Sequence, residues 1–258
     1  MLLKTAKIVA LVPYKIWVDV LLRIGRLPFR PGRIHVNLID AIYASERRRN
    51  LPVVSQVMDL TFTQELDFIV EEERAFPGDQ EFRKSGYTHT MLKRYFFSGK
   101  YFCDGKEILD SCSGIGWGTC ILSKYAKSIT AYDIDERAVE FASSYWKVKN
   151  VDWRTGDALN HDFLDGKLFD VVLAMETIEH FSRADAERYI RNIADSVKEQ
   201  GYLIGSSAFP KTREQADALC STNPYHLFIF TEKEILLLLK TYFRKVSLIN
   251  RWMFIAQK

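Results

Sequence analysis

The sequence predicts an α/β fold built on a doubly wound, mostly parallel sheet. From about residue 107 to residue 242, segments with strand character alternate with segments of helical periodicity. The run Phe169–Met175 is almost entirely apolar, as a parallel strand buried on both faces requires. A loop of small residues, with glycines at 114, 116 and 118, follows the first strand of this series. Glycine allows the backbone to approach a ligand closely, so this loop is the first candidate binding element.

The predicted elements follow one another without a long gap. A strand containing Ile108 and Leu109 ends in Asp110, and a helix is expected to open at about Thr119. Asp135 and Glu136 are suited to begin the helix after the second strand. The other predicted elements are strands over 128–132, 151–155, 169–175 and 201–205, and helices around 184–198 and over 231–242.

The glycine loop does not have the spacing that binds a dinucleotide. That fingerprint needs glycine at positions i, i+2 and i+5, and the i+5 position is Thr119 when counted from Gly114 and Trp117 when counted from Cys112. Taken alone, the loop is also compatible with a plain strand-to-helix turn. Its acid ahead of alternate glycines resembles the S-adenosylmethionine (SAM) loop of class I methyltransferases.

The resemblance extends from about Arg94 to the C-terminus and implies a Rossmann-like core with seven strands. The sequence is similar to small-molecule O- and N-methyltransferases, including ubiquinone-type O-methyltransferases and enzymes found with bacterial polysaccharide synthesis. It implies SAM as methyl donor and S-adenosylhomocysteine (SAH) as product. Asp133, after the second strand, would accept the ribose hydroxyls, and Asp157, after the third, would meet the adenine amino group.

The resemblance assigns a set of residues to the cofactor. Cys112 departs from the family pattern, which usually has glycine there and cysteine at Ser113, so the loop is bulkier and stiffer at its first turn. Arg94 would pair with the SAM carboxylate or stay at the surface, and Tyr95 would lie across SAM or pack in the core. The predicted cofactor residues are Arg94, Tyr95, Asp110, Ser111, Cys112, Ser113, Gly114, Gly116, Trp117, Asp133, Ile134, Asp157, Ala158 and Glu176.

Methyl transfer to a hydroxyl requires alignment of the acceptor and removal of its proton. His180 has a pKa suited to that task, and in a helix it would share one side with Glu176 and Glu179. His226 lies in a long connection after the fifth strand that is expected to act as a lid. We therefore predict His180, His226 and Glu179 as catalytic residues, with packing or capping as the alternative for each histidine. The same Glu-x-x-Glu-His spacing binds a divalent ion in some quinone O-methyltransferases, but no metal is expected here.

Composition limits the other classes of function. The net charge of +3 is too small to indicate a nucleic-acid surface, and the four cysteines lack metal-ligand spacing and indicate a cytoplasmic protein. The sequence Asn223-Pro-Tyr is not a nucleic-acid amino-methylation signature, because that signature belongs directly after the fourth strand. We predict a helical N-terminal extension over residues 1–90 and a methyltransferase domain over residues 91–258. Within the extension, Asp40 is expected to cap a helix over 41–49, and a second helix is expected over 61–74.

The first part of the extension is strongly basic. Residues 1–39 carry seven basic groups and one acid, and an apolar side that includes Trp17 has helical spacing. Charges and Pro13 interrupt the segment before it could span a membrane. Residues 1–27 are therefore predicted to lie on a membrane surface at its inner face, or else to cover the core or a partner in a homodimer.

The function predicted from these observations is SAM-dependent methyl transfer to a hydroxyl of a small molecule, with a sugar or lipid-linked glycan as the first expectation. The nearest alternative is an N-methyltransferase acting on an amino sugar. A second class of function is a catalytically inactive protein of the same fold that serves as a binding scaffold, and Cys112 is the residue that supports it.

Overall fold

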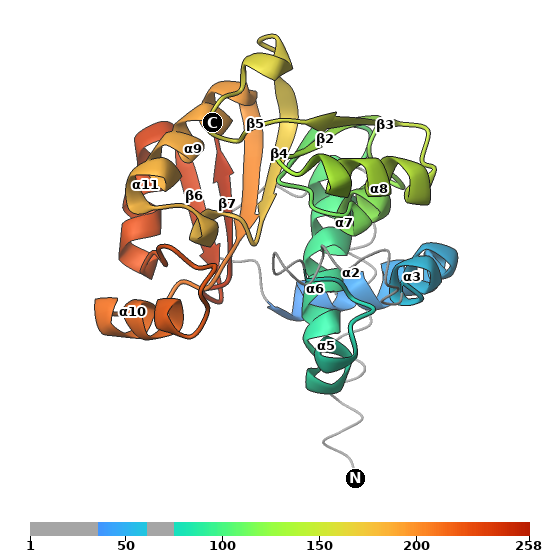
Figure 1. Cartoon of the computed structure of the whole chain (residues 1–258), viewed down its shortest axis with the longest axis horizontal. Coiled ribbons are helices and arrows are strands. Elements are labelled where there is room, and N and C mark those ends of the chain that lie inside the picture. The colour runs from blue at the N-terminus through green and yellow to red at the C-terminus, as the bar shows by residue number, and fades with distance from the viewer. Residues whose placement is uncertain (1–35, 61–74) are drawn as a thin grey trace, which may run out of the picture. The chain divides into compact units, whose positions relative to one another are not determined.

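The computed structural model describes residues 36–60 and 75–258, and a seven-stranded sheet lies at its centre (Figure 1). The strand order is β3-β2-β1-β4-β5-β7-β6. Strands β1 to β5 pair in parallel, whereas β7 is antiparallel to both β5 and β6. The strands are β1 (Glu107–Ser111), β2 (Ser128–Asp133), β3 (Val151–Thr155), β4 (Phe169–Met175), β5 (Val197–Ser206), β6 (Lys245–Ile249) and β7 (Met253–Gln257). The predicted fold class, a Rossmann-like and mostly parallel sheet of seven strands, is confirmed.

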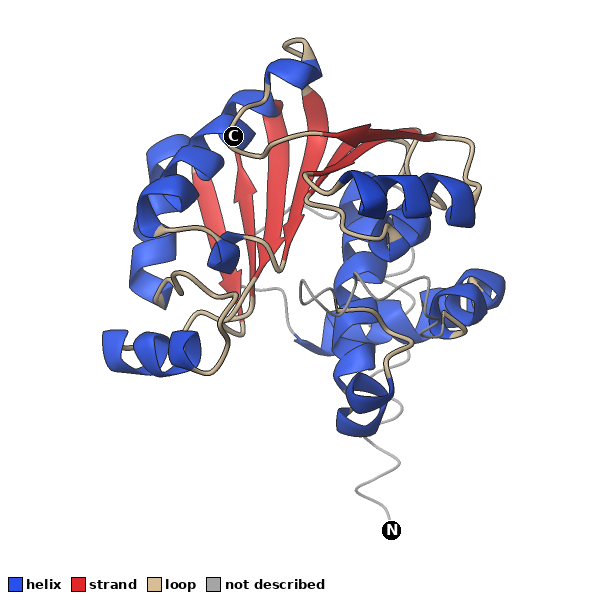
Figure 2. Ribbon diagram, viewed as in Figure 1, coloured by secondary structure: helices blue, strands red, loops and turns tan. Residues whose placement is uncertain are grey.

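Helices cover both sides of the sheet (Figure 2). In this view α7 and α8 lie on one side, and α9 and α11 lie on the other. The helices are α2 (Val36–Arg49), α3 (Leu51–Met58), α5 (Gln80–Ser85), α6 (Tyr87–Ser98), α7 (Trp117–Leu122), α8 (Glu136–Trp146), α9 (Arg183–Ser196), α10 (Arg213–Ser221) and α11 (Glu232–Tyr242), with a π-helical turn over Gly99–Cys103.

The order of the strands fixes where a ligand can bind. From β1 the chain moves outward through β2 and β3, and it then returns to the other side of β1 with β4. The loops that follow β1 and β4 therefore lead in opposite directions and leave a crevice at the carboxyl ends of these two strands. Both the glycine loop and the segment from Glu176 to His180 begin at this edge.

Several predicted boundaries are confirmed by specific contacts. Strands β3 and β4 have the predicted limits, and β4 is buried at every position except Asp170, which is half-buried. Asp135 caps α8 by accepting from the backbone N–H of Arg137. Thr231 and Glu234 form a capping box at the start of α11.

Three predicted boundaries are wrong. Helix α7 begins at Trp117 and not at Thr119, because Gly116, at a φ of 77°, turns the chain directly into the helix. Helix α9 ends at Ser196, and β5 starts at Val197, earlier than the predicted strand at residue 201. Asp40 does not cap a helix, since α2 already begins at Val36; its carboxylate lies 2.7 Å from Nζ of Lys93 on α6.

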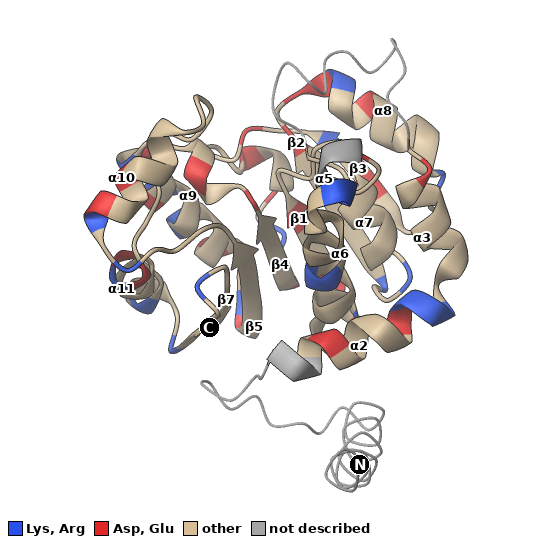
Figure 3. Cartoon of the chain, turned by 90° about the horizontal axis from the view of Figure 1, so that it is seen from below, with Lys and Arg blue, Asp and Glu red and all other residues tan. Residues whose placement is uncertain are grey.

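The described part of the N-terminal extension packs against the domain. Ile39, Ile42 and Tyr43 of α2 are buried, α2 contacts α6, and α3 contacts α7. The last turn of α2 is basic, with Arg47, Arg48 and Arg49 (Figure 3). Among the described residues, no helix is both long and apolar enough to cross a membrane. The predicted helix over 61–74 and the segment 1–27 lie outside the described residues, and the boundary at residue 90 stays a prediction.

Candidate active site

The glycine loop connects β1 to α7 through three residues in the left-handed region. Cys112 and Gly114 have φ values of 54°, and Gly116 has 77°. A Cβ at Gly116 would lie 2.5 Å from the Trp153 ring, so glycine is required there for space as well as for conformation. A Cβ at Gly114 would meet nothing within 4 Å. The loop is thus closed on the side of the helix and open at Gly114.

Cys112 is the unfavourable residue of this loop. A residue with a Cβ in the left-handed region is strained relative to glycine, and such strain is concentrated at functional sites. Burial, together with the nearby Asp133, raises the pKa of the Cys112 thiol well above its ordinary value. The thiol therefore stays protonated at neutral pH and is not a nucleophile.

Asp133 is held in place by backbone groups from two segments. Gly114 N–H donates to one carboxylate oxygen at 2.8 Å, and Asp135 N–H donates to the other at 3.1 Å. The adjacent Ile134 is 70% exposed, which is unusual for a large apolar side chain. The predicted ribose acid and its exposed apolar neighbour thus stand beside the open part of the loop.

The predicted adenine segment is joined to the same edge. Gly156 N–H donates to the carbonyl oxygen of Asp133 at 2.9 Å. The Asp157 side chain accepts from Leu159 N–H at 2.8 Å, and Asn192 donates to the carbonyl oxygen of Ala158 at 3.3 Å. These bonds fix the turn that carries Asp157 and Ala158 next to Asp133.

Asp110 lies beneath the loop. It is 1% exposed and accepts from the Thr119 hydroxyl at 2.5 Å. Burial raises the pKa of this carboxyl to about 7. Tyr95 and Trp117 are also buried, with ring centroids 4.7 Å apart, and a Cβ at Gly118 would meet the Tyr95 ring at 2.2 Å. Gly118 therefore serves the packing of Tyr95 against α7.

Arg94 is paired with Glu176 at the end of β4. Its Nη1 lies 2.6 Å from a Glu176 oxygen, and Tyr87 donates to the second oxygen at 2.9 Å. The guanidinium also lies over the Trp252 ring at 5.2 Å, and its buried Nε has no hydrogen-bond partner. Burial, reinforced by Glu176, raises the pKa of Tyr87 to about 12, so its hydroxyl remains a donor.

Sequence reasoning missed Tyr87, which lies seven positions before the predicted Arg94. Residues 87 and 94 are two helical turns apart, so both side chains lie on one face of α6. That spacing is the signal from which the Tyr87–Arg94 pair was predictable.

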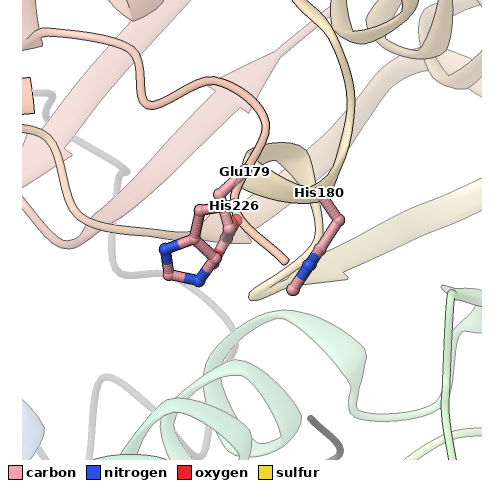
Figure 4. Close-up of side chains that lie close together, drawn as sticks. All are labelled: Glu179, His180 and His226. Carbon is pink, nitrogen blue, oxygen red and sulfur yellow. The ribbon is translucent and has the colours of Figure 1, made fainter. Parts of the chain in front are cut away.

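Glu179, His180 and His226 form a second cluster of side chains (Figure 4). One ligand atom of each residue lies within 4.8 Å of the other two, which makes the three a candidate set of metal ligands. The ring centroids of the two histidines are 5.4 Å apart. The structure therefore brings together the three residues predicted as catalytic.

The predicted helical stacking of Glu176 with Glu179 and His180 is wrong. Glu176 has a φ of 50°, and residues Ile178–His180 form a single 3-10 turn. The reversal at Glu176 directs this side chain to Arg94, whereas Glu179 and His180 meet His226. Glu179 is 3% exposed, and burial together with Glu176 raises its pKa well above the ordinary value.

The hydrogen bonds of the two histidines define their basic nitrogens. Nδ1 of His180 lies 3.2 Å from the carbonyl oxygen of Tyr225 and must donate to it, so Nε2 is the basic nitrogen. Asn223 accepts from Tyr225 N–H at 3.0 Å, which directs its amide nitrogen to Nε2 of His226 at 3.2 Å. Nε2 of His226 is therefore already an acceptor.

The lid that carries His226 is held by long-range contacts. Leu227 and Phe228 donate backbone N–H groups to the carbonyl oxygen of Glu179 at 2.8 and 3.3 Å. The Phe228 ring lies 5.4 Å from the Arg183 guanidinium and 4.6 Å from that of Arg213. Both arginines also bind Glu234. We call Phe228, Arg183, Arg213 and Glu234 the lid clamp; no sequence motif indicated it.

Comparison with known proteins relates the same part of the sequence to methyltransferases. Residues 109–205 match the family model described as a methyltransferase domain. The ubiquinone biosynthesis O-methyltransferase of Rickettsia akari is 32% identical over 101 residues, which are 39% of this chain and 39% of that protein. Residues 109–205 are thus similar to the methyltransferase domain of class I, SAM-dependent enzymes. The chain spans about two fifths of the length of the curated relatives it matches.

Solved structures resemble the methyltransferase domain in fold. The PH0226 protein from Pyrococcus horikoshii OT3 has a TM-score of 0.55 and 21% identity, and the match covers 76% of this chain and 98% of that one. The N-methyltransferase NodS from Bradyrhizobium japonicum WM9, in complex with SAH, has a TM-score of 0.52 and 18% identity, over 84% of this chain and 96% of that one.

Proposed function

We propose that this protein transfers a methyl group from SAM to a hydroxyl of a small molecule. The observation that carries the proposal is the 2.8 Å hydrogen bond from Gly114 N–H of the glycine loop to the carboxylate of Asp133, the last residue of β2. This bond sets an oriented carboxylate beside an open stretch of backbone and the exposed Ile134. The carboxylate suits the ribose of SAM, the exposed apolar side chain suits its adenine ring, and the open backbone suits its amino-acid tail.

The residues present suit SAM. Asp133 would bind the ribose, Ile134 would cover one adenine face, and Asp157 with Ala158 would meet the adenine edge. Arg94, whose buried Nε lacks a partner, would bind the carboxylate of the methionine part, and Glu176 would attract its ammonium group. When bound, SAM supplies a methyl group on a sulfonium that needs no further activation to leave.

We infer that His180 is the base that removes the acceptor proton. Its Nδ1–H donates to the Tyr225 carbonyl, which orients the ring and stabilises the imidazolium that forms when Nε2 takes a proton. His226 is a weaker candidate, because Asn223 already donates to its Nε2. Glu179 is buried with a raised pKa and is proposed to support the histidines in its neutral form.

A metal-assisted reaction is a second candidate, favoured by the ligand atoms of Glu179, His180 and His226 within 4.8 Å of one another. A divalent cation held there would lower the pKa of an acceptor hydroxyl directly. Turnover with and without a chelator separates the two mechanisms: full activity in EDTA rejects the metal, and loss that returns with added Mg²⁺ or Zn²⁺ rejects the metal-free base.

The class of acceptor is proposed from the sequence around His226 and from the charge of the N-terminal segment. The lid sequence around Asn223–Thr231 is similar to polysaccharide-associated methyltransferases, and residues 1–39 are basic. We propose a sugar or lipid-linked glycan as acceptor for a cytoplasmic protein that touches the inner face of a membrane. An amino sugar methylated on nitrogen is the alternative acceptor.

Two measurements test the proposal. Calorimetric titration with SAM and SAH is expected to give binding; its absence would reject the function. Radiolabelled SAM with fractionated cell extract is then expected to label a small molecule in a His180-dependent manner. Binding without any labelled product would favour the alternative of an inactive scaffold, for which the strained Cys112 is the structural support.

A further inference from the structure

A continuous chain of hydrogen bonds, buried from Tyr189 to Tyr132 and partly buried at His161, runs beneath the segments predicted to bind the cofactor. The Tyr189 hydroxyl lies 2.8 Å from Oγ of Ser111, which lies 2.6 Å from the Tyr132 hydroxyl. Tyr132 lies 3.0 Å from Nε2 of His161, and Nδ1 of His161 lies 3.1 Å from Oγ of Ser196. We call these five residues the hydroxyl chain. Both tyrosines are fully buried, and none of the five touches the His180 cluster through a hydrogen bond in the described residues.

The direction of the hydroxyl chain follows from its end at Ser196. Ser196 donates its only hydroxyl hydrogen to the carbonyl oxygen of Asn192 at 3.0 Å. Oγ of Ser196 must therefore accept from Nδ1–H of His161, and Nε2 of a neutral imidazole is then an acceptor. Tyr132 consequently donates to His161, Ser111 donates to Tyr132, and Tyr189 donates to Ser111. Ser111, Tyr132, His161 and Ser196 each donate one hydrogen bond and accept one, so every hydrogen of the chain has an acceptor.

The neutral form of His161 is consistent with its surroundings. Burial lowers the pKa of the ring, while the backbone of Asn192 and the carboxylates of Asp157 and Asp195 act in the opposite direction. The other groups packed on the ring are the Tyr132 and Phe163 side chains. At neutral pH the ring is therefore an acceptor at Nε2.

The hydroxyl chain joins the three segments assigned to SAM. Ser111 directly precedes Cys112 in the loop, and Tyr132 directly precedes Asp133. His161 follows the turn of Asp157 and Ala158, whose carbonyl is held by Asn192. These segments follow three different strands, β1, β2 and β3, and a change in their spacing would separate the groups that hold the ribose, the amino-acid tail and the adenine.

We propose that His161 is a positioning residue for the SAM site, which fixes the spacing of these three segments through Tyr132 and Ser111. The inference rests on the proposed function, because it assumes that the segments bind SAM. No recognisable sequence motif surrounds His161, and its role follows only from the contacts of the folded chain.

Protonation of His161 would reverse part of the hydroxyl chain. Nε2 then becomes a donor, so Tyr132 must accept from it and donate to Ser111. Ser111 would receive two donors, and its own hydrogen would turn to Sγ of Cys112, 3.8 Å away. The change thus reaches the first residue of the loop. Affinity for SAM and SAH is expected to fall as the pH drops below the ordinary histidine value.

Calorimetry with SAH at pH 7.5 and at pH 5.5 tests the proposal. At pH 7.5, His161→Phe and Tyr132→Phe are each expected to weaken binding about two- to tenfold, the loss of one buried hydrogen bond. The double variant is expected to be no weaker than either single variant, because both remove the same bond. His161→Gln keeps an acceptor for Tyr132 and should bind at pH 7.5 almost as wild type does.

The pH profile separates positioning from a merely structural role. Wild type is expected to lose affinity between pH 7.5 and pH 5.5 by more than His161→Gln does, since only wild type titrates at this position. Acids such as Asp110 titrate in both proteins and cancel in the comparison. A matched control is His89→Phe, which breaks the 2.8 Å bond between Tyr43 and His89, away from the SAM segments, and should leave affinity unchanged.

The outcomes are distinguishable. No binding of SAH by wild type would reject the proposed function itself. Binding by wild type with unchanged affinity in His161→Phe and Tyr132→Phe would reject the positioning role, as would an equal loss in His89→Phe. Identical pH profiles for wild type and His161→Gln would reject the protonation effect. If His161→Phe does not fold, as judged by thermal melting, Tyr132→Phe and His161→Gln carry the same test.

Discussion

The two halves of the crevice are built by different means. On the cofactor side, Asp133 is oriented by the backbone N–H groups of Gly114 and Asp135, and its own carbonyl binds Gly156. On the side predicted for the acceptor, Nδ1 of His180 is held by the carbonyl oxygen of Tyr225, 45 residues later, and the segment that carries His226 is held by the lid clamp. Asp133 is therefore positioned by the loops of neighbouring strands, 19 residues apart for Gly114 and Asp133, whereas His180 and His226 are positioned by contacts between more distant parts of the domain.

The largest expected effect is on the acceptor side. His180→Ala is expected to lower kcat about 10²- to 10⁴-fold, because it removes the base and leaves the cofactor loop intact. SAM affinity should remain within a few-fold of wild type. Steady-state kinetics with an identified acceptor and calorimetry with SAM measure the two quantities separately.

His226→Ala is the comparison variant for this experiment. Because Nε2 of His226 already accepts from Asn223, we expect it to lose less turnover than His180→Ala does. If both variants keep near wild-type turnover, neither histidine is the base, and the assignment of the acceptor side is wrong.

A smaller effect, confined to the other half, is expected at Asp133. Asp133→Ala should weaken SAM binding by about 1.5–3 kcal/mol, as expected for hydrogen bonds to a charged group. Asp152→Ala is a matched control, since Asp152 is an acid of β3 that pairs with Arg154 at the surface. An unchanged dissociation constant for Asp133→Ala, in a protein with native thermal stability, would count against the ribose assignment.

The elements that depend on residues close in sequence are the ones that the sequence could predict. The alternation of strands and helices along the chain, the limits of β3 and β4 and the caps of α8 and α11 follow from residues close in sequence, and they were predictable. The same holds for the glycine loop, whose geometry is fixed by Gly114 and Gly116.

The predicted stacking of Glu176 with Glu179 and His180 was wrong because contacts between distant segments decide the conformation there. The reversal at Glu176 is stabilised by Arg94 and Tyr87 of α6, about 80 to 90 positions earlier, and no local pattern near Glu176 indicates it. The lid clamp and the role of Tyr87 belong to the same class. His161 has no informative neighbours in the sequence and gains its partners only when β2 and α9 pack around it.

The cofactor half also contains a buried carboxyl that should make stability depend on pH. Burial raises the pKa of Asp110 to about 7 from an ordinary value of 3.8, so the folded state holds this proton more tightly than the unfolded chain does. The contribution of Asp110 to the free energy of unfolding is therefore fully present below pH 3.8, and it is lost as the pH rises toward 7. Asp110→Asn removes the dependence and keeps an acceptor for Thr119.

Thermal melting at pH 5 and pH 8 checks this prediction. Relative to wild type, the melting temperature of Asp110→Asn should be higher at pH 8 than at pH 5. The difference should correspond to about 1–2 kcal/mol of unfolding free energy at pH 8, and it stays this small because a buried carboxylate relaxes its surroundings and admits water. A difference that is constant with pH would show that Asp110 is ionised at both values.

Disruption of the lid clamp is expected to weaken binding of the acceptor by about 1 kcal/mol. Phe228→Leu keeps an apolar side chain and removes two cation–π contacts, so the segment next to His226 should loosen. We expect a higher KM for the acceptor and an unchanged affinity for SAM. Leu237→Ala, at an exposed position of α11, is the control. Weaker SAM binding in Phe228→Leu would contradict the separation of the two halves.

Deletion of residues 1–27 is expected to have the smallest effect on the two sides of the crevice. This segment carries basic groups at 4, 7, 15, 23 and 26 against one acid at 19, and each Lys or Arg near an anionic leaflet contributes about 1 kcal/mol that salt screens. Full-length protein should therefore float with anionic vesicles at low salt and be released at high salt. The truncated protein should not float, and its SAM affinity should stay within a few-fold of wild type. If the segment instead covers the core or a partner subunit, vesicles will not carry the intact protein, and the deletion will lower the melting temperature or dissociate a dimer.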